Sequence, residues 1–396
     1  MFTTPDQNDA SATLPPFSAP GPRADGFFQD CNPAQGFAGT RPLAEHFNEQ
    51  IVNNRALLAK ARIAAVKGDE TMLWRAILNL ALITQSVTFN VAAGGTVEPA
   101  DPFAGDPFNS LASALGFLAN YRIAPGISVV IQIAPGSFAT PSIDFAHPNG
   151  AQLTIKGSGV SQTILTFPSN LHGIILSADL FQLQDLTLQG QSTAPAAQPW
   201  LAAGLYLPGT TMRLQAVTVA GFAGHGISIG GGSVSVPIGA TTTVQNCRAE
   251  GVSVGTNGTF NAPISGSVLV VSNCGGLANI VVGSALCTVD EIRCSGGAQG
   301  VVVSGSGAAL TARKLGVDVA TNPAAVEANN GGMMIAATGA LLGDWWTWSV
   351  AANTPQNFYA NGYGFIRTAA ALATNNRSNT NPALNTPGNI QAFIQG

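Results

Sequence analysis

Apolar residues between positions 183 and 317 follow one recurring pattern: apolar, two polar or small residues, apolar, any residue, apolar. The pattern occurs six times, and successive copies begin 31, 30, 27, 18 and 23 residues apart. The copies begin at Leu183, Leu214, Val244, Val271, Val289 and Ala312. Because side chains alternate between the two faces of a strand, two consecutive non-core residues change the phase and require a bend. The repeat therefore predicts a chain that turns a corner again and again around one apolar core.

A corner that returns every 18 to 31 residues is typical of a parallel β-helix, in which each coil stacks on the last and loops of variable length leave a coil. A propeller would show a steadier period of about 40 to 50 residues, and a sandwich would not keep the corner in register. Asn246 and Asn273 should occupy equivalent corner positions, where an amide side chain tolerates unusual backbone angles. We predict an all-β fold, a single-stranded parallel β-helix (solenoid) over residues 126–340, with N-terminal helices and an aromatic-rich C-terminal cap.

The residues that precede the predicted β-helix have other patterns. Residues 1–42 are rich in proline and should be irregular. Apolar residues from position 43 follow steps of three and four, which predicts a helical neck over residues 43–84. A short coiled coil and an amphipathic helix lying on its own domain both fit that pattern. Residues 85–125 should form a linker and a capping helix, with Asp106 as N-cap and Pro107 in the first turn.

The small number of charged residues limits the partners that the protein can have. Only 9% of its residues are charged and 46% are apolar, and 16 Lys and Arg leave a net charge of −4. This is too little positive charge to neutralise a phosphate backbone or an anionic lipid surface, so we expect no nucleic-acid partner. No apolar run approaches the ~20 residues that span a bilayer, so we expect no membrane insertion. The first 22 residues hold no Lys or Arg and no apolar core, so we expect no signal peptide.

Cysteine and histidine residues do not indicate a metal or cofactor site. The five cysteines are an odd number without paired spacing, and we expect buried thiols. In the repeat, Cys247 and Cys274 fall at equivalent inward positions, and Cys294 falls two positions further along its own coil. The four histidines are scattered, and no coil supplies the cluster of carboxylates that Ca²⁺ requires. We therefore expect neither a metal nor a cofactor.

Acidic residues of the repeat are the candidates for catalysis. A glycoside hydrolase needs two carboxyl groups about 5 to 9.5 Å apart, and coils stack at ~4.8 Å, so neighbouring coils could supply such a pair. The weak candidates are Asp185, Glu250, Asp290 and Glu291. Corner and loop carboxylates in solvent are the simpler interpretation. Five basic residues near corners suit either contact with acidic sugars or a soluble surface: Arg213, Arg248, Arg293, Arg313 and Lys314.

Aromatic residues concentrate beyond position 341, in a segment that we expect to be a C-terminal cap or oligomerisation segment (residues 341–396). Aromatic rings can stack on sugar rings, and they equally plug the end of a core or an oligomer contact. The weak candidates for glycan binding are Trp345, Trp346, Trp348 and, within the repeat, Tyr206.

Two stretches resemble bacteriophage tail proteins. The segment DCNPAQGFAGTRPLAEHFNEQI, within residues 30–52, resembles the N-terminal region of tail fibres and tailspikes, where a Gly-Thr pair leads into a short helix. Residues 106–159 run from DPFNSLASALGFLANYRI through VVIQIAPGSFA to HPNGAQLTIKGSG, and they resemble the entry into the β-helix of pectate-lyase-like tailspikes. The resemblance implies a right-handed parallel β-helix, a homotrimer, attachment to the virion by the N-terminus and recognition of surface polysaccharide.

The expected function is that of a virion structural protein, a short tailspike or tail fibre that binds a host surface glycan. Residues 1–42 would attach it to phage tail, baseplate or portal-region proteins. Its location would be the virion, after assembly in the host cytoplasm without a signal peptide. A tailspike depolymerase of the glycoside hydrolase type is the main alternative, so enzymatic activity stays open. A purely structural decoration or connector protein is the second alternative.

Overall fold

The chain divides into two compact units, residues 1–84 and 85–396. The computed structural model describes residues 52–59, 72–73, 82–192, 196, 202–262 and 266–318, and the strand residues 326–329, 333–336, 358–360, 365–368 and 393–395. In the first unit, residues 52–59 and 72–73 are helical, and most of the remaining residues of the predicted neck lie outside the described ones. Leu58 is buried there against Leu57, Met72 and Leu73. The predicted attachment segment, residues 1–42, lies outside the described residues.

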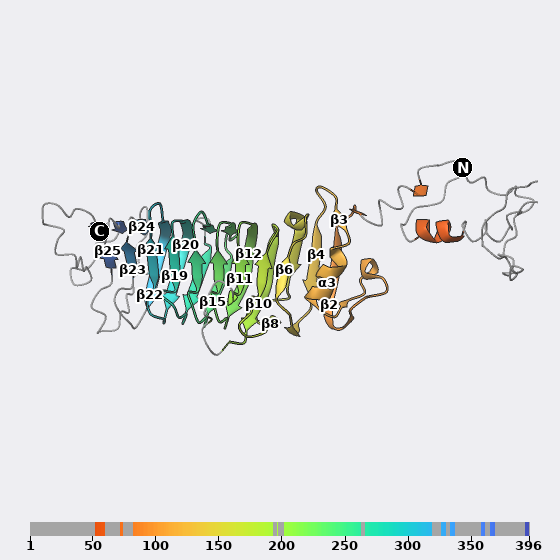
Figure 1. Ribbon diagram of the computed structural model, residues 1–396, viewed down its shortest axis with the longest axis horizontal. Helices are drawn as coiled ribbons and strands as arrows, with labels where there is room; N and C mark the ends of the chain where they lie inside the picture. Colours follow the sequence, from red (N-terminus) through yellow and green to blue (C-terminus); the bar gives the residue numbers. More distant parts are fainter. Residues whose placement is uncertain are drawn as a thin grey trace, which may run out of the picture. The chain divides into compact units, whose positions relative to one another are not determined.

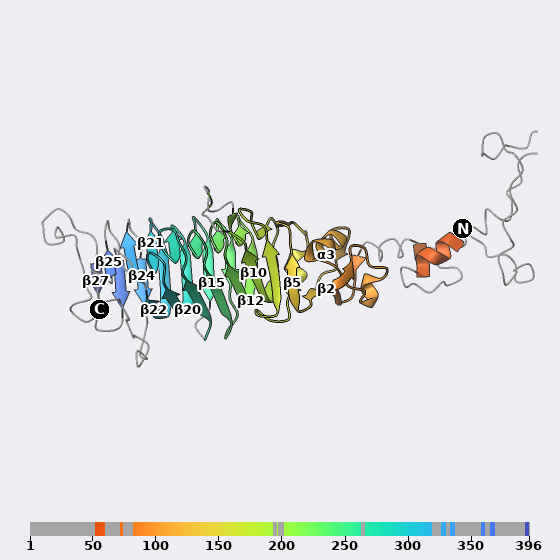
Figure 2. The ribbon, with the colours of Figure 1, turned by 90° about the horizontal axis from the view of Figure 1, so that it is seen from below.

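The second unit is a parallel β-helix, which confirms the predicted fold class (Figures 1 and 2). Its strands form a 16-stranded sheet and a nine-stranded sheet, and neighbouring coils pair in parallel in both. Each full coil contributes two legs to the larger sheet and one leg to the smaller sheet. Residues about one coil apart in the sequence therefore lie side by side, and equivalent side chains stack along the axis.

The larger sheet contains β2 (Val87–Thr96), β4 (Val129–Ile133), β5 (Gly136–Ala139), β7 (Leu153–Lys156), β8 (Thr163–Phe167), β10 (Gln182–Gly190), β12 (Thr211–Ala220), β14 (Ser233–Ser235), β15 (Thr241–Gln245), β17 (Thr259–Ala262), β18 (Val268–Ser272), β20 (Leu286–Ser295), β22 (Ala309–Asp318), β24 (Met333–Ala336), β26 (Phe365–Thr368) and β27 (Phe393–Gln395). The smaller sheet contains β6 (Ile143–Phe145), β9 (Ile174–Leu176), β11 (Leu205–Leu207), β13 (Ile227–Ile229), β16 (Val252–Val254), β19 (Ile280–Gly283), β21 (Val301–Ser304), β23 (Val326–Asn329) and β25 (Phe358–Ala360). The remaining elements are β1 (Leu82–Ile83), β3 (Arg122–Ile123), the α-helix α3 (Leu111–Leu118) and the 3-10 helices η2 (Pro102–Ala104) and η3 (Gly150–Gln152).

Helix α3 begins later than the sequence predicted. Its N-cap is Ser110, whose side chain accepts a hydrogen bond from the backbone N–H of Ser113. Asp106 is not the cap; its carboxylate accepts from the backbone N–H of Asp101. Residues 107–109 cannot form the first helical turn because they pair with the end of β2, where the Thr96 N–H donates to the Pro107 carbonyl.

The β-helix extends beyond both predicted boundaries. Strand β2 precedes α3 and pairs directly with β4, so the first coil starts at Val87 and not at residue 126. Helix α3 contacts β2 and β4, as a cap over the first coil should. At the other end, β25 pairs with β23, and β26 pairs with β24 and β27. The described strands beyond residue 340 therefore continue both sheets.

Strand pairing corrects the predicted alignment of the repeat. Leu183 pairs with Leu214, but Val244 pairs with Val219 of the preceding coil and not with the Leu214 position. The copies at Leu183 and Leu214 mark the first corner, between the two legs of the larger sheet. The copies at Val244 and Val271 mark a second corner, between the larger and the smaller sheet. Pairs on the first leg give coil lengths of 31, 22, 26, 27 and 23 residues. Both corners join inward-facing strands, so both carry the same sequence pattern.

The second corner is a stack of residues in left-handed backbone conformation. Asn246 and Asn273 have φ of 55° and 51°, and Gly221 and Gly296 have φ of 69° and 60°. Backbone hydrogen bonds connect these consecutive coils, from the Gly221 N–H to the Gln245 carbonyl and from the Asn246 N–H to that of Ser272. Only glycine and, less readily, asparagine visit this region without a large penalty. The predicted equivalence of the two asparagines is confirmed.

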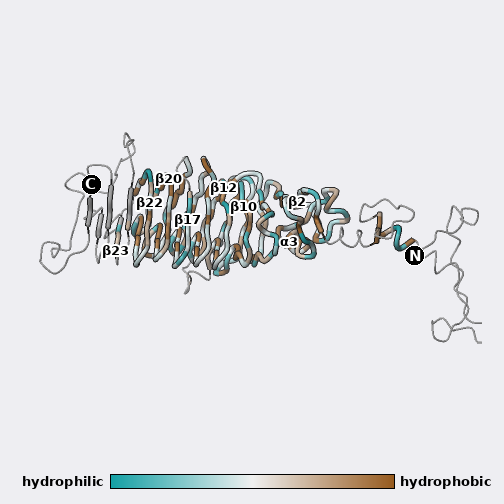
Figure 3. Tube along the Cα trace, turned by 90° about the horizontal axis from the view of Figure 1, so that it is seen from above, coloured by the Kyte–Doolittle hydropathy of each residue, from teal (hydrophilic) through white to brown (hydrophobic). Residues whose placement is uncertain are grey.

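The core consists of inward-facing aliphatic, aromatic and cysteine side chains, and hydrophobic and hydrophilic residues alternate along the strands (Figure 3). Four cysteines are buried free thiols, as expected: Cys247, Cys274, Cys287 and Cys294. Burial raises the pKa of Cys287 to about 12. Cys294 pairs with Val271, three residues before the position of Cys274, so its predicted placement further along the coil is wrong. The error follows from the two corners being aligned as one.

Candidate functional site

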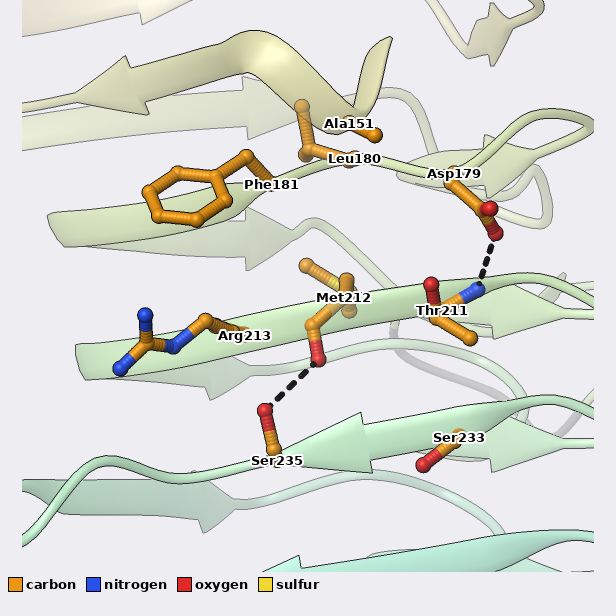
Figure 4. A pocket seen from close by; sticks show the side chains of 9 residues that line it. All are labelled: Ala151, Asp179, Leu180, Phe181, Thr211, Met212, Arg213, Ser233 and Ser235. Carbon is orange, nitrogen blue, oxygen red and sulfur yellow. Dashed lines mark hydrogen bonds between the residues drawn. The ribbon is translucent and has the colours of Figure 1, made fainter. Parts of the chain in front are cut away.

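A cavity of about 190 Å³ opens on the outer face of the larger sheet, between the segment that leads into β10 and the strands β12 and β14 (Figure 4). Its lining residues are Ala151, Asp179, Leu180, Phe181, Thr211, Met212, Arg213, Ser233 and Ser235. It combines an aromatic ring, a cation, a carboxylate and hydroxyl groups. Sites that bind small polar ligands are concave and combine apolar walls with a few oriented polar groups.

The register of the strands aligns polar side chains along this face. Gln182 pairs with Arg213, Arg213 pairs with Ser235, and the same position continues over the following coils. The side chains of this polar ladder are those of Thr154, Gln182, Arg213, Ser235, Asn261, Thr288 and Thr311. The residues before and after each ladder position in β12 and β20 are buried, because alternation points them inward. Thr154 and Gln182 are buried, so the accessible part of this row of hydrogen-bonding groups runs parallel to the coil axis from Arg213 onward.

One aromatic side chain, Phe181, and one charged side chain, Arg213, define one end of the cavity. Phe181 is 41% exposed, and the guanidinium carbon of Arg213 lies 5.4 Å from the centroid of its ring. Figure 4 shows both side chains at the same end of the cavity. Cation–π contact of this kind orients the guanidinium and leaves its edge free to donate hydrogen bonds.

The opposite end of the cavity is fixed by hydrogen bonds. The Asp179 carboxylate oxygen Oδ1 accepts from the backbone N–H of Thr211 at 2.7 Å, as Figure 4 shows. Nearer the Arg213 end, the Ser235 hydroxyl donates to the Met212 carbonyl at 3.4 Å. Asp179 and Arg213 therefore lie at opposite ends of the cavity, so one end carries a negative charge and the other a positive charge.

A network of amides adjoins the cavity at the first corner. The Gln182 amide donates to the side-chain oxygens of Gln184 at 2.9 Å and Gln215 at 2.6 Å. The Gln184 amide donates to Asp185 at 2.7 Å. Asp185 has φ of 55° at this corner, one residue beyond the ladder of paired glutamines. Its carboxylate is therefore part of a structural network and stands beside the cavity without lining it.

The other predicted carboxylates are held by cations. Asp290 is fully buried and forms a two-bond ion pair with Arg313, whose Nη2 lies 2.8 Å from Asp290 Oδ2. This hydrogen bonding from Arg313 keeps the pKa of Asp290 below its usual value. Glu291 is paired with Arg293 at 2.5 Å and Lys314 at 3.8 Å.

Glu250 belongs to a third location, the second corner. Its Oε2 lies 2.9 Å from His225 Nδ1, and its Oε1 accepts from the Leu277 N–H at 3.1 Å. Burial raises the pKa of Glu250, but the contact with His225 and the backbone hydrogen bonds, the one from Leu277 among them, together outweigh burial, and the pKa is lowered. Asp185 lies four coils from Asp290, roughly 19 Å at the usual strand spacing, so the structure does not bring the candidates from different coils together as a pair.

Tyr206, the predicted aromatic candidate that the structure describes, is not at the cavity. Tyr206 lies on β11 in the smaller sheet, where its ring stacks on His172 with 5.8 Å between centroids. Trp345, Trp346 and Trp348 lie outside the described residues. The residue that sequence reasoning missed is Phe181. It directly precedes β10, so it is not held by the strand pairing that fixes which side chains of β10 point inward. Phe181 is two residues from the buried Leu183, so strand alternation would point it inward, and the sequence gives no signal of its exposure.

Two searches of the described residues give negative findings. In the part of the chain that the structure describes, no three His, Cys, Asp or Glu side chains are grouped as metal ligands. Within the same ranges, no helix has the length and apolar character to cross a membrane.

Comparison with known proteins leaves the family open. No family model and no curated protein matches the chain. One solved structure that matches is the Azotobacter vinelandii mannuronan C-5 epimerase AlgE6 A-module, with a TM-score of 0.25 and 13% sequence identity, over 61% of this chain and 67% of that chain. We draw no conclusion about activity from similarity at this level. The class of protein that the structure does define is a parallel β-helix protein with a polar and aromatic outer cavity.

Proposed function

We propose that the protein is a virion-associated adhesin, a short tailspike or tail fibre, that binds a host surface glycan on the outer face of the larger sheet and does not cleave it. The observation that carries the proposal is the cavity between the segment that leads into β10 and the strands β12 and β14, with the exposed Phe181 beside a ladder of amides and hydroxyls. Sugar rings pair an apolar face with a rim of hydroxyl groups. An exposed ring beside side chains that both donate and accept hydrogen bonds matches that combination.

The state of the carboxylates favours binding over hydrolysis. Hydrolysis needs one carboxyl group that gives up a proton and a second that acts from the other side of the sugar. Asp290 and Glu291 are ion-paired, Glu250 is bonded to His225, and Asp185 accepts from Gln184. The ion pair with Arg313 lowers the pKa of Asp290 and so favours its charged form, which is the wrong form for a general acid.

The virion part of the proposal is supported by the resemblance of residues 30–52 and 106–159 to phage tail proteins. A homotrimer attached to tail, baseplate or portal-region proteins through residues 1–42 follows from the same resemblance. Sedimentation of the purified full chain as a trimer and its presence in purified particles would support this part. A monomer that does not associate with particles would contradict it.

Retention of polysaccharide tests the binding part. The full chain is incubated with capsule or lipopolysaccharide from a susceptible host, and both retention and polymer length are measured. We expect retention without shortening. Phe181→Ala should weaken retention about 5- to 10-fold, the value of one aromatic contact. The matched control is Leu171→Ala, which removes another exposed apolar side chain, 49% exposed, away from the cavity. Shortened polymer would support a depolymerase, and no retention would refute glycan binding.

A further inference from the structure

The basic residues of the repeat differ in whether they are paired. Arg293, Arg313 and Lys314 form ion pairs with Glu291 or Asp290. Arg213 is different: it is exposed, lines the cavity and contacts the Phe181 ring, and the described residues supply no carboxylate partner for it. A cation left without a counterion beside an aromatic platform is available to a ligand.

The immediate ladder neighbours of Arg213 are uncharged, and one further cation lies nearby. Its ladder neighbours Gln182 and Ser235 are neutral. Lys156, half-buried at the end of β7, also has no ion pair among the residues that the structure describes. Strands β7 and β12 lie on either side of β10, so the two cations flank the amides of β10 at a strand separation of roughly 10 Å.

The acidic residues nearby limit where an anionic ligand can place its charge. Asp179 occupies the far end of the cavity and is bonded to the Thr211 N–H (Figure 4). Asp185 accepts from Gln184 at the corner. An anionic group is therefore favoured at the Arg213 end and disfavoured at the Asp179 end. Such a charge gradient would orient a bound sugar chain.

We propose that the glycan bound in this cavity is anionic and that Arg213 binds a carboxylate of a uronic acid unit. The guanidinium is a planar fork that donates two parallel hydrogen bonds to a carboxylate. Stacking on Phe181 limits the rotamers of Arg213, so less conformational freedom is lost when the ligand binds. This inference rests on the proposed glycan-binding function and specifies the chemistry of its ligand.

Calorimetric titration of the full chain with two matched probes tests the inference. One probe is an oligogalacturonate, and the other is the same oligosaccharide after reduction of its carboxyl groups, which keeps the sugar rings and removes the charge. We expect the acidic probe to bind at least 10-fold more tightly. Arg213→Gln should weaken its binding about 10- to 100-fold, because a charge-assisted bidentate contact is lost. Asp179→Asn should tighten it about two- to fivefold, because a repulsive charge is removed while an acceptor for the Thr211 N–H remains.

Arg248→Gln is the matched control, since Arg248 is an exposed arginine at the second corner, outside the cavity. It should bind the acidic probe as the unmodified protein does. Equal losses in the Arg213 and Arg248 variants would overturn the inference. Tight binding of the reduced probe would also overturn it and leave the proposed glycan binding intact. Dextran sulfate binding with the same dependence on Arg213 would overturn the carboxylate assignment. Failure of both sugar probes, together with no retention of host polysaccharide, would refute the glycan-binding function itself.

Discussion

The stack of left-handed residues at the second corner makes Asn246 the sharpest test of the fold. Asn246 has φ of 55°, its side chain is exposed, and Gly221 and Asn273 occupy the same position in the neighbouring coils. We compare two substitutions, Asn246→Ala and Asn246→Gly. Both shorten an exposed side chain, but only glycine removes the Cβ atom that makes this backbone conformation costly.

The expected magnitudes follow from the backbone alone. A non-glycine residue in the left-handed region costs ~1–2 kcal/mol, and asparagine pays less because its side chain bonds locally. Asn246→Ala should therefore lower the free energy of unfolding by about 1 kcal/mol. Asn246→Gly relieves the strain in the folded state, but glycine also stabilises the unfolded chain by about 0.5–1 kcal/mol through its greater conformational entropy. The free energy of unfolding of this variant should therefore lie within about 0.5 kcal/mol of that of the unmodified protein.

Urea unfolding of the full chain, followed by far-UV circular dichroism, measures both variants at equal protein concentration. The matched control is Asn261→Ala, an exposed asparagine on β17 with ordinary strand geometry, which should change the free energy of unfolding by no more than about 0.5 kcal/mol. A glycine variant that is less stable than the alanine variant would show that the corner is not held in this conformation.

Three further perturbations probe other parts of the structure. Asp290→Asn should cost about 3–5 kcal/mol in urea unfolding, because it leaves the Arg313 guanidinium without its buried partner. Gly226→Ala should cost about 1–3 kcal/mol in the same measurement, because the new Cβ would lie 2.1 Å from Val244 Cγ1 and 2.7 Å from a backbone carbonyl of the next coil. The melting temperature should fall as the pH drops below about 6.5. Burial lowers the pKa of His147, so the folded protein favours the neutral ring. Below about pH 6.5 the unfolded chain takes up a proton on this residue before the folded chain does, and folding stability is lost until the pH reaches the folded pKa.

Each of these perturbations has a control and a contradicting result. Gly209→Ala places a Cβ in open space and should be neutral; an equal loss in both glycine variants would contradict the close packing of the coils. His147→Gln removes the titrating ring and should reduce the acid-induced fall in melting temperature. An unchanged pH profile would show that His147 is not responsible. An Asp290→Asn variant as stable as the unmodified protein would mean that the ion pair is not formed.

The fold class could be predicted because inward positions of a β-helix must be apolar in every coil, and the sequence keeps that rule. The coil lengths could not, because the corner at Leu214 and the corner at Val244 obey the same local rule. Only the pairing of Val244 with Val219 separates them. Two left-handed positions of the second corner were visible as Asn246 and Asn273, since few other residues tolerate that backbone.

The candidate site was harder to predict than the fold. Arg213 was recognised as a possible contact to acidic sugars, but its value depends on Phe181 and on the absence of a partner in the described residues. Both are properties of the folded surface. Likewise, Asp290 looked available in the sequence because its partner Arg313 lies one coil later, as does Lys314, the more distant of the two partners of Glu291. Pairing across coils is invisible to a local pattern.

Hydrogen exchange with and without bound oligogalacturonate tests the central claim, that the outer face over β10, β12 and β14 is the binding surface. The claim predicts new protection in peptides that cover residues 179–184 and 211–215. Protection confined to the Tyr206 face of the smaller sheet, or binding without any change in these peptides, would contradict it.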